Sequence, residues 1–130
     1  MRHKLSGRKL NRSGAHRKAL ARNLFRELIT HHRIVTTPEK AKNFRPFAEK
    51  LITLAKVKSL HNVRLALSAV PDKTVVKKLF DVVGPHFQNR PGGYTRILRL
   101  SKNRLGDNAG QAIWELVDLP RSAATDAADE

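Results

Sequence analysis

The spacing of apolar residues over residues 15–80 predicts four helices. The first follows Ser13, a good N-cap, and ends at His31-His32, while the second opens with Thr37-Pro38. Ser59 and Asp72 are N-cap residues for the third and fourth helices. The four apolar stripes are, in order, Leu20, Ala21, Leu24, Phe25 and Leu28; then Ala41, Phe44, Ala48, Leu51, Ile52 and Ala55; then Leu60, Val63, Leu67 and Val70; and then Val75, Val76, Leu79 and Phe80.

Two prolines modify this pattern. Pro46 lies in the middle of the second helix, where it removes a backbone donor and restricts Arg45. We therefore expect a kink or a break there, with Pro46 on the outer side of the helix. The fourth helix is expected to end before Gly84-Pro85.

Three further stretches predict strands. Residues 33–37 form a β-branched run, and the turn-rich residues 89–93 lead into a strand over residues 94–100. A loop over residues 101–111 then precedes a last strand over residues 112–118. The last two strands should pair antiparallel, with residues 33–36 alongside. The order helix, strand, three helices, two strands predicts an α+β fold of two layers, in which helices cover a small mixed or antiparallel sheet.

The 130 residues are expected to form one domain with a segment at each end. Residues 1–12 contain Leu5 and Leu10 as their only sizeable apolar side chains, so we predict an extended basic arm that becomes ordered on a partner. Residues 13–119 form the globular domain. Residues 120–130 are small and acidic, and we expect them to be disordered.

Charge indicates the kind of partner. The chain has 26 Lys and Arg residues against 11 Asp and Glu, a formal net charge of +15, which favours a polyanion. A membrane surface is one polyanion, but no stretch approaches the ~18 uninterrupted apolar residues of a membrane span. Charges also interrupt every apolar run, which argues against a secretory signal. A mitochondrial transit peptide remains an alternative for residues 1–29, which are basic and poor in acid.

Little in the sequence suggests catalysis, so we expect no enzyme, no metal and no cofactor. The chain has no cysteine, and Gly92-Gly93 precedes a strand and not the helix of a phosphate-binding loop. His31 and His32 are adjacent, and adjacent helical residues do not share the face that two metal ligands need. Asp107 lies in a glycine-containing loop, where aspartate is usually a turn former.

A basic arm that leads into a basic helix is typical of a nucleic-acid binder. Aromatic residues make up only 5% of the chain, and we expect Tyr94 and Trp114 to lie in the core and not to stack on bases. The signatures of RRM and KH domains are missing, so the pattern indicates recognition of RNA shape and backbone. Arg17 lies on the apolar stripe of the first helix. It either contacts phosphate from an overhanging first turn or extends from the edge of the core into solvent.

Several motifs in a fixed order resemble the bacterial ribosomal large-subunit protein seventeen family. They are Met1-Arg-His-Lys4, Gly7-Arg-Lys-Leu-Asn-Arg12, His16-Arg17, Thr36-Thr37 with Lys40-Ala-Lys42, Leu51-Ile-Thr-Leu-Ala-Lys56, Gly92-Gly-Tyr-Thr-Arg-Ile97 and Gly106-Asp-Asn-Ala109. The resemblance spans residues 1 to about 119. Because it begins at Met1, it disfavours the transit-peptide alternative. Pro46 and the acidic residues after Leu119 do not belong to the family pattern.

The resemblance implies a structural component of the large subunit of a bacterial ribosome, in the cytoplasm. An organellar ribosome is the less favoured alternative. The partners implied by the resemblance are large-subunit rRNA and neighbouring ribosomal proteins near the tunnel exit, with no membrane and no small-molecule substrate. The residues that it assigns to RNA contact are Arg2, His3, Lys4, Arg8, Lys9, Arg12, His16 and Arg17, and more weakly Arg96, Arg99 and Arg104. Arg22, on the polar side of the first helix, is added from the charge pattern. The alternative function is a nucleoid-type protein or RNA chaperone that acts free of the ribosome.

Overall fold

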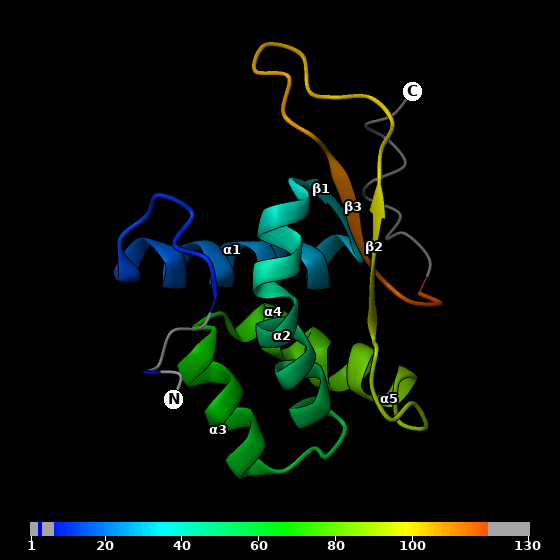
Figure 1. The fold of residues 1–130 in the computed structure, drawn as a ribbon. Helices are drawn as coiled ribbons and strands as arrows, with labels where there is room; N and C mark the ends of the chain where they lie inside the picture. The colour runs from blue at the N-terminus through cyan, green and yellow to red at the C-terminus, as the bar shows by residue number, and fades with distance from the viewer. Residues whose placement is uncertain (1–2, 4–6, 120–130) are drawn as a thin grey trace.

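The computed structural model describes His3 and residues 7–119 (Figure 1). The predictions for Arg2, Lys4 and the acidic residues 120–130 lie outside this part of the chain. The elements are α1 (Gly14–His31), β1 (Arg33–Thr36), α2 (Pro38–Ala55), α3 (Leu60–Ala69), α4 (Lys73–Lys78), the π-helical segment η1 (Leu79–Val83), α5 (Gly84–His86), β2 (Thr95–Arg99) and β3 (Ala112–Leu116). The predicted α+β class and the order of its elements are confirmed.

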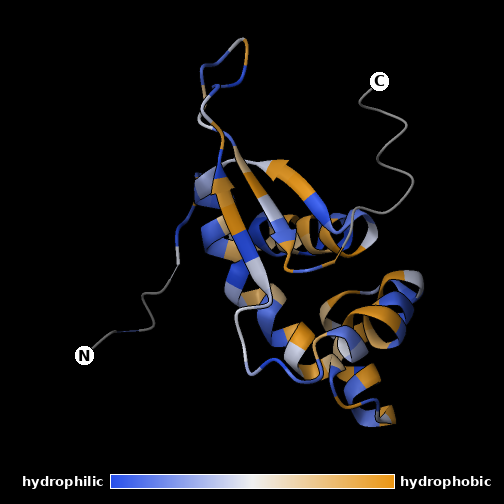
Figure 2. Ribbon diagram, turned by 90° about the vertical axis from the view of Figure 1, so that its right-hand side faces the viewer, coloured by the Kyte–Doolittle hydropathy of each residue, from blue (hydrophilic) through white to orange (hydrophobic). Residues whose placement is uncertain are grey.

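The three described strands form one antiparallel sheet in the order β1-β3-β2. Ile113 of β3 is paired with Val35 on one side and with Leu98 on the other. Helices α1 and α2 pack on the sheet, whereas α3 and α4 pack mainly against α1, α2 and each other. In Figure 1 the sheet lies above and α3 to α5 lie below, and Figure 2 shows the three strands side by side with helices behind them.

The core extends from the interface of α1, α2 and the sheet to the inner sides of α3, α4 and η1. Its largest side chains are Trp114, Tyr94, Phe25 and Phe87, all of them almost fully buried. Tyr94 and Trp114 are therefore core residues, as the sequence predicted. The whole predicted stripe of α2 is buried as well, because its spacing follows the helical period.

Capping residues set the helix boundaries. The Ser13 hydroxyl accepts a hydrogen bond from the His16 amide at 3.3 Å, and Ser59 and Asp72 cap α3 and α4 in the same way. At the other end of α1, His32 adopts a left-handed conformation (φ 62°), and its amide donates to the Leu28 carbonyl. The His32 carbonyl accepts from the Leu116 amide at 2.9 Å, which ties the end of α1 to the sheet.

Helix α2 runs through Pro46 without a break, because buried residues on both sides of the proline pack into one core; Pro46 itself is exposed, as expected. A kink at Pro46, the other expectation, stays a prediction. The predicted end of the fourth helix is wrong. The fourth helix does not end before Gly84-Pro85 but continues through η1 into α5. Pro85 lies in the first turn of α5, directly after the π-helical segment, in which the Gly84 amide donates to the Leu79 carbonyl.

Gly84 lies where two helices come into close contact. A Cβ atom at this position would lie 2.3 Å from the Ala55 carbonyl oxygen, so only glycine allows η1 and α5 to approach the end of α2.

Helix α3 is more weakly packed than its sequence suggested. Leu60, the first residue of the predicted stripe, is 67% exposed, and Ala66 is the one fully buried residue of α3.

Candidate nucleic-acid interface

Residues 7–12, the described part of the predicted arm, do not extend from the domain but turn back against it. Leu10 packs on the core, and the Arg8 amide donates a 2.8 Å hydrogen bond to Asn43 Oδ1 on α2. Leu10 and Asn11 have positive φ angles, and the Arg12 amide donates to the Lys9 carbonyl. Residues 7–12 therefore form a turn on the domain and do not extend from it, since Leu10 gains burial by folding back. That the arm as a whole becomes ordered on a partner stays a prediction.

Arg17 holds this turn in place. Its Nη1 donates to the Arg12 carbonyl at 2.6 Å, and Arg12 Nη1 in turn donates to the Leu10 carbonyl at 3.0 Å. Both arginines are half-buried. A guanidinium carries five N–H donors, so these bonds leave donors for an anion. Arg17 therefore has a structural role that neither interpretation of the sequence included.

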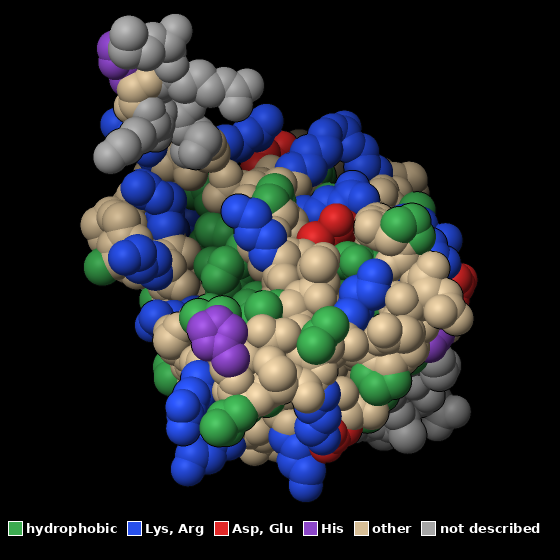
Figure 3. Space-filling model, turned by 90° about the horizontal axis from the view of Figure 1, so that it is seen from below, with side chains coloured by type: hydrophobic (Ala, Val, Ile, Leu, Met, Phe, Trp, Pro, Cys, Tyr) green, Lys and Arg blue, Asp and Glu red, His purple; other side chains and the backbone are tan. Residues whose placement is uncertain are grey.

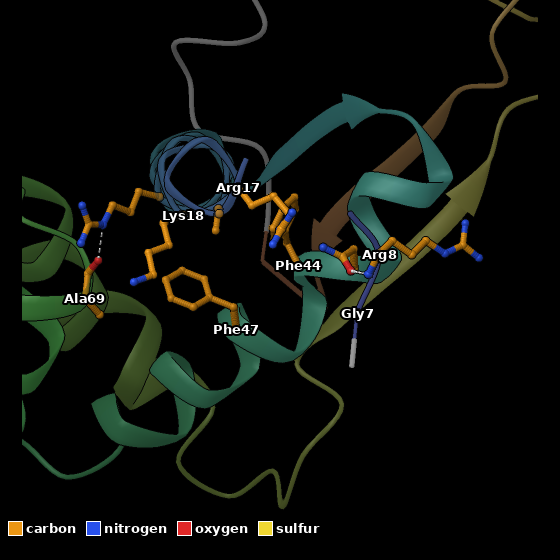
Figure 4. A pocket seen from close by; sticks show the side chains of 11 residues that line it. Gly7, Arg8, Arg17, Lys18, Phe44, Phe47 and Ala69 are labelled. Atoms are coloured by element: carbon orange, nitrogen blue, oxygen red, sulfur yellow. Dashed lines mark hydrogen bonds between the residues drawn. The ribbon is translucent and has the colours of Figure 1, made fainter. Parts of the chain in front are cut away.

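An open groove of about 600 Å³ lies between residues 7–8, α1 and α2 (Figures 3 and 4). Ala21, Phe44 and Phe47 contribute its apolar surface. Figure 3 shows a hollow beside the N-terminal segment, with hydrophobic side chains at its base and Lys and Arg side chains around it. The cationic residues that line the groove are Arg8, Arg17, Lys18 and Arg22.

The groove combines three of the predicted residues with one that was missed. Arg22 Nε donates to the Ala69 carbonyl at 2.8 Å, which joins α1 to the end of α3, and Arg8 directs its side chain away from the groove in Figure 4. Lys18 was not among the candidates, although it lies four residues before Arg22 and so on the same helical face. That spacing could have identified it.

The other N-terminal candidates are placed as follows. His3, Lys9 and His16 are exposed, and none of the three lines the groove.

The candidates on the sheet form a second group. Arg96 Nε donates to Glu115 Oε1 at 2.8 Å, and Arg104 Nε donates to Asp107 Oδ1 at 3.0 Å. The hydrogen bond from Arg104, with a second from the Ala109 amide, lowers the pKa of the Asp107 carboxyl to about 2, and the same pair raises the pKa of Arg104. Arg99 is exposed, with no ion pair to any residue that the structure describes.

The two groups occupy different parts of the molecule. Figure 1 shows the loop between β2 and β3 extending beyond the sheet, away from the segment that precedes α1. Because Arg96 and Arg104 already have carboxylate partners, the groove end of the domain is the better candidate for phosphate contact.

Comparison with known proteins identifies the family. The family model described as ribosomal protein L17 matches residues 20–117. The chain belongs to this family. It is also 49% identical, over 98% of its own length and 91% of the relative's, to a protein of Maridesulfovibrio salexigens named large ribosomal subunit protein bL17. The resemblance drawn from short motifs is thus confirmed for nearly the whole chain. Within the residues that the structure describes, no helix has the length and apolarity to cross a membrane.

Proposed function

We propose that this chain is a structural constituent of the large ribosomal subunit, where it binds and organises large-subunit rRNA. The observation that carries the proposal is the 49% identity, over 98% of the chain, to a protein named as a component of that subunit. The net charge of +15 is consistent with it, since an rRNA scaffold supplies the compensating phosphates.

The N-terminal end supplies the main RNA contact in this proposal. Residues 1–12 and the first turns of α1 carry Arg2, His3, Lys4, Arg8, Lys9, Arg12, His16, Arg17 and Arg22. Arg8 and Lys9 support it best, because their side chains are exposed and make no ion pair with any residue that the structure describes. Arg99 provides a second, weaker contact from the β2–β3 side of the domain, and Arg96 and Arg104 join it when their bonds to Glu115 and Asp107 open.

The role is architectural in this view. The protein neutralises phosphates and fixes RNA segments relative to one another, in contact with neighbouring ribosomal proteins near the tunnel exit. It acts in the cytoplasm as part of the ribosome, without turnover of a substrate.

Sedimentation of tagged protein tests this proposal. We expect the protein to remain with large subunits through a high-salt wash, because many phosphate contacts act together. Release into the soluble pool would instead support a free nucleoid-type protein or RNA chaperone. Substrate turnover that is abolished when Asp107 or a histidine is changed would contradict the architectural role.

A further inference from the structure

The groove between α1 and α2 combines an aromatic surface with cationic side chains. A phosphate backbone alone needs only the cations. The surface of the groove includes the rings of Phe44 and Phe47, and its edges carry Arg17, Lys18 and Arg22. Its volume of about 600 Å³ lies within the range of small-ligand sites, roughly 300–1,000 Å³. A phosphate would use the cations but would leave the aromatic surface exposed to water.

We propose that this groove binds a single unpaired RNA nucleotide, with its base against Phe47 and its phosphates beside Lys18 and Arg22. The inference rests on the proposed function, and it names the part of the RNA that this site takes. Every base has an apolar π-face for an aromatic ring, and in a duplex that face is hidden by stacking. A nucleotide that has left its helix therefore supplies both the apolar face and the negative charge.

The charges of the groove favour RNA over a protein occupant. Its cationic side chains are those of Arg17, Lys18 and Arg22, since Arg8 points away, and no lining residue is acidic. Lys18 makes no hydrogen bond to any residue that the structure describes, and Arg22 uses its Nε while its terminal nitrogens remain for a phosphate.

The polar and aromatic groups of the groove are held in position before binding. Phe47 packs edge-on against Phe25, with ring centroids 5.9 Å apart and an interplanar angle of 81°. Asn43 Oδ1 is fixed by the Arg8 amide, which leaves its Nδ2 as a donor for a base edge. Because Phe47 and Asn43 are already held, their ordering adds little to the entropic cost of binding, and Lys18 is the side chain that has to become ordered. Figure 4 shows the side chains of Phe47 and Lys18 together between α1 and α2.

Filter binding of the full-length protein to deproteinised large-subunit rRNA tests the inference. Phe47→Leu keeps the apolar volume but removes the ring, and we expect it to weaken binding by roughly tenfold, as removal of one stacked base does. The slope of affinity against salt should not change, because the variant keeps every cationic side chain that contacts phosphate. Phe47→Tyr should bind like the wild type. Lys18→Gln should lower the slope, whereas Lys50→Gln, an exposed residue outside the groove, should not.

The outcomes separate this inference from the proposed function. If Phe47→Leu binds large-subunit rRNA as tightly as the wild type, the inference is overturned and the proposed function stands. If the wild-type protein does not prefer large-subunit rRNA to small-subunit rRNA, the proposed function fails, and the inference falls with it.

If Phe47→Leu does not fold, a cross-linking experiment with a photoreactive residue tests the inference instead. With p-azidophenylalanine at position 47, illumination of the complex should cross-link the protein to an unpaired nucleotide. A cross-link to a paired nucleotide, to protein, or to nothing would overturn the inference.

Discussion

Replacing Arg8 and Lys9 with glutamine should reduce the salt dependence of RNA binding and leave the domain folded. Both side chains are exposed, and Arg8 is fixed to α2 through its backbone amide, which the substitution preserves. Deleting Met1–Arg12 removes more charge and should also leave a folded domain with weaker RNA binding. It is the less clean experiment, because it also removes the packing of Leu10 on the core.

The size of the effect follows from counterion release. Each cation removed from a phosphate lowers the slope of log affinity against log salt by about 0.7–0.9, so the slope of the double variant should fall by about 1.4–1.8. Between 50 and 200 mM salt, the affinity of the wild type should therefore decrease by roughly tenfold more than that of the variant. For the deletion, which removes Arg2, Lys4, Arg8, Lys9 and Arg12, the slope should fall by up to about 3.5–4.5.

Filter binding to large-subunit rRNA at several salt concentrations measures the slope, and circular dichroism checks the fold. The matched control replaces Lys73 and Lys77, two exposed lysines on α4 that do not line the groove. An unchanged slope in the Arg8 and Lys9 variant would remove these residues from the interface. An equal fall in the control would show that only net charge matters.

Three further predictions concern stability and pH. Gly84→Ala should destabilise the protein by about 1–3 kcal/mol, because the new Cβ meets the Ala55 carbonyl; an unchanged midpoint of urea unfolding would contradict this. Ser13→Ala should cost about 0.5–1 kcal/mol through removal of the N-cap, and equal stability would show that the hydroxyl does not cap α1. The Asp107 carboxyl should titrate near pH 2 by NMR, and its contribution, present above its ordinary pKa of 3.8, should be lost as the pH falls through about 2. In Arg104→Gln its pKa should rise towards 3.8, and a wild-type midpoint already near 3.8 would refute the ion pair.

Much of the fold could be read from the sequence because its signals are local. The helical spacing of Ala41 to Ala55 marked a stripe that is wholly buried, and Ser13, Ser59 and Asp72 marked the beginnings of three helices. The β-branched run over residues 33–37 and the turn-rich residues before Tyr94 marked strands, and the single loop over residues 101–111 made antiparallel pairing of the last two strands the natural expectation. The positive charge, and with it the expectation of a polyanionic partner, needs no structure at all.

The tertiary structure decided what depends on interactions between distant residues. Gly84 and Pro85 are typical signs of a helix end, yet the helix continues through them, and Gly84 is needed for its close contact with Ala55, which a Cβ atom would prevent. The turn of residues 7–12 depends on Asn43, 35 residues away from Arg8, and on the hydrogen bond from Arg17. Likewise, Glu115 and Asp107 determine which arginines remain available to RNA.

The sequence by itself determined the elements, the core stripes, the basic N-terminal end and the family. Each of these depends on residues that are close together in the sequence or on the order of short motifs. Only the tertiary structure decided that residues 7–12 fold against α1 and α2 and that Phe47, Lys18 and Arg22 line one groove. The physical reason is that burial and hydrogen bonding act between residues that are far apart along the chain, and no local pattern specifies which of them meet.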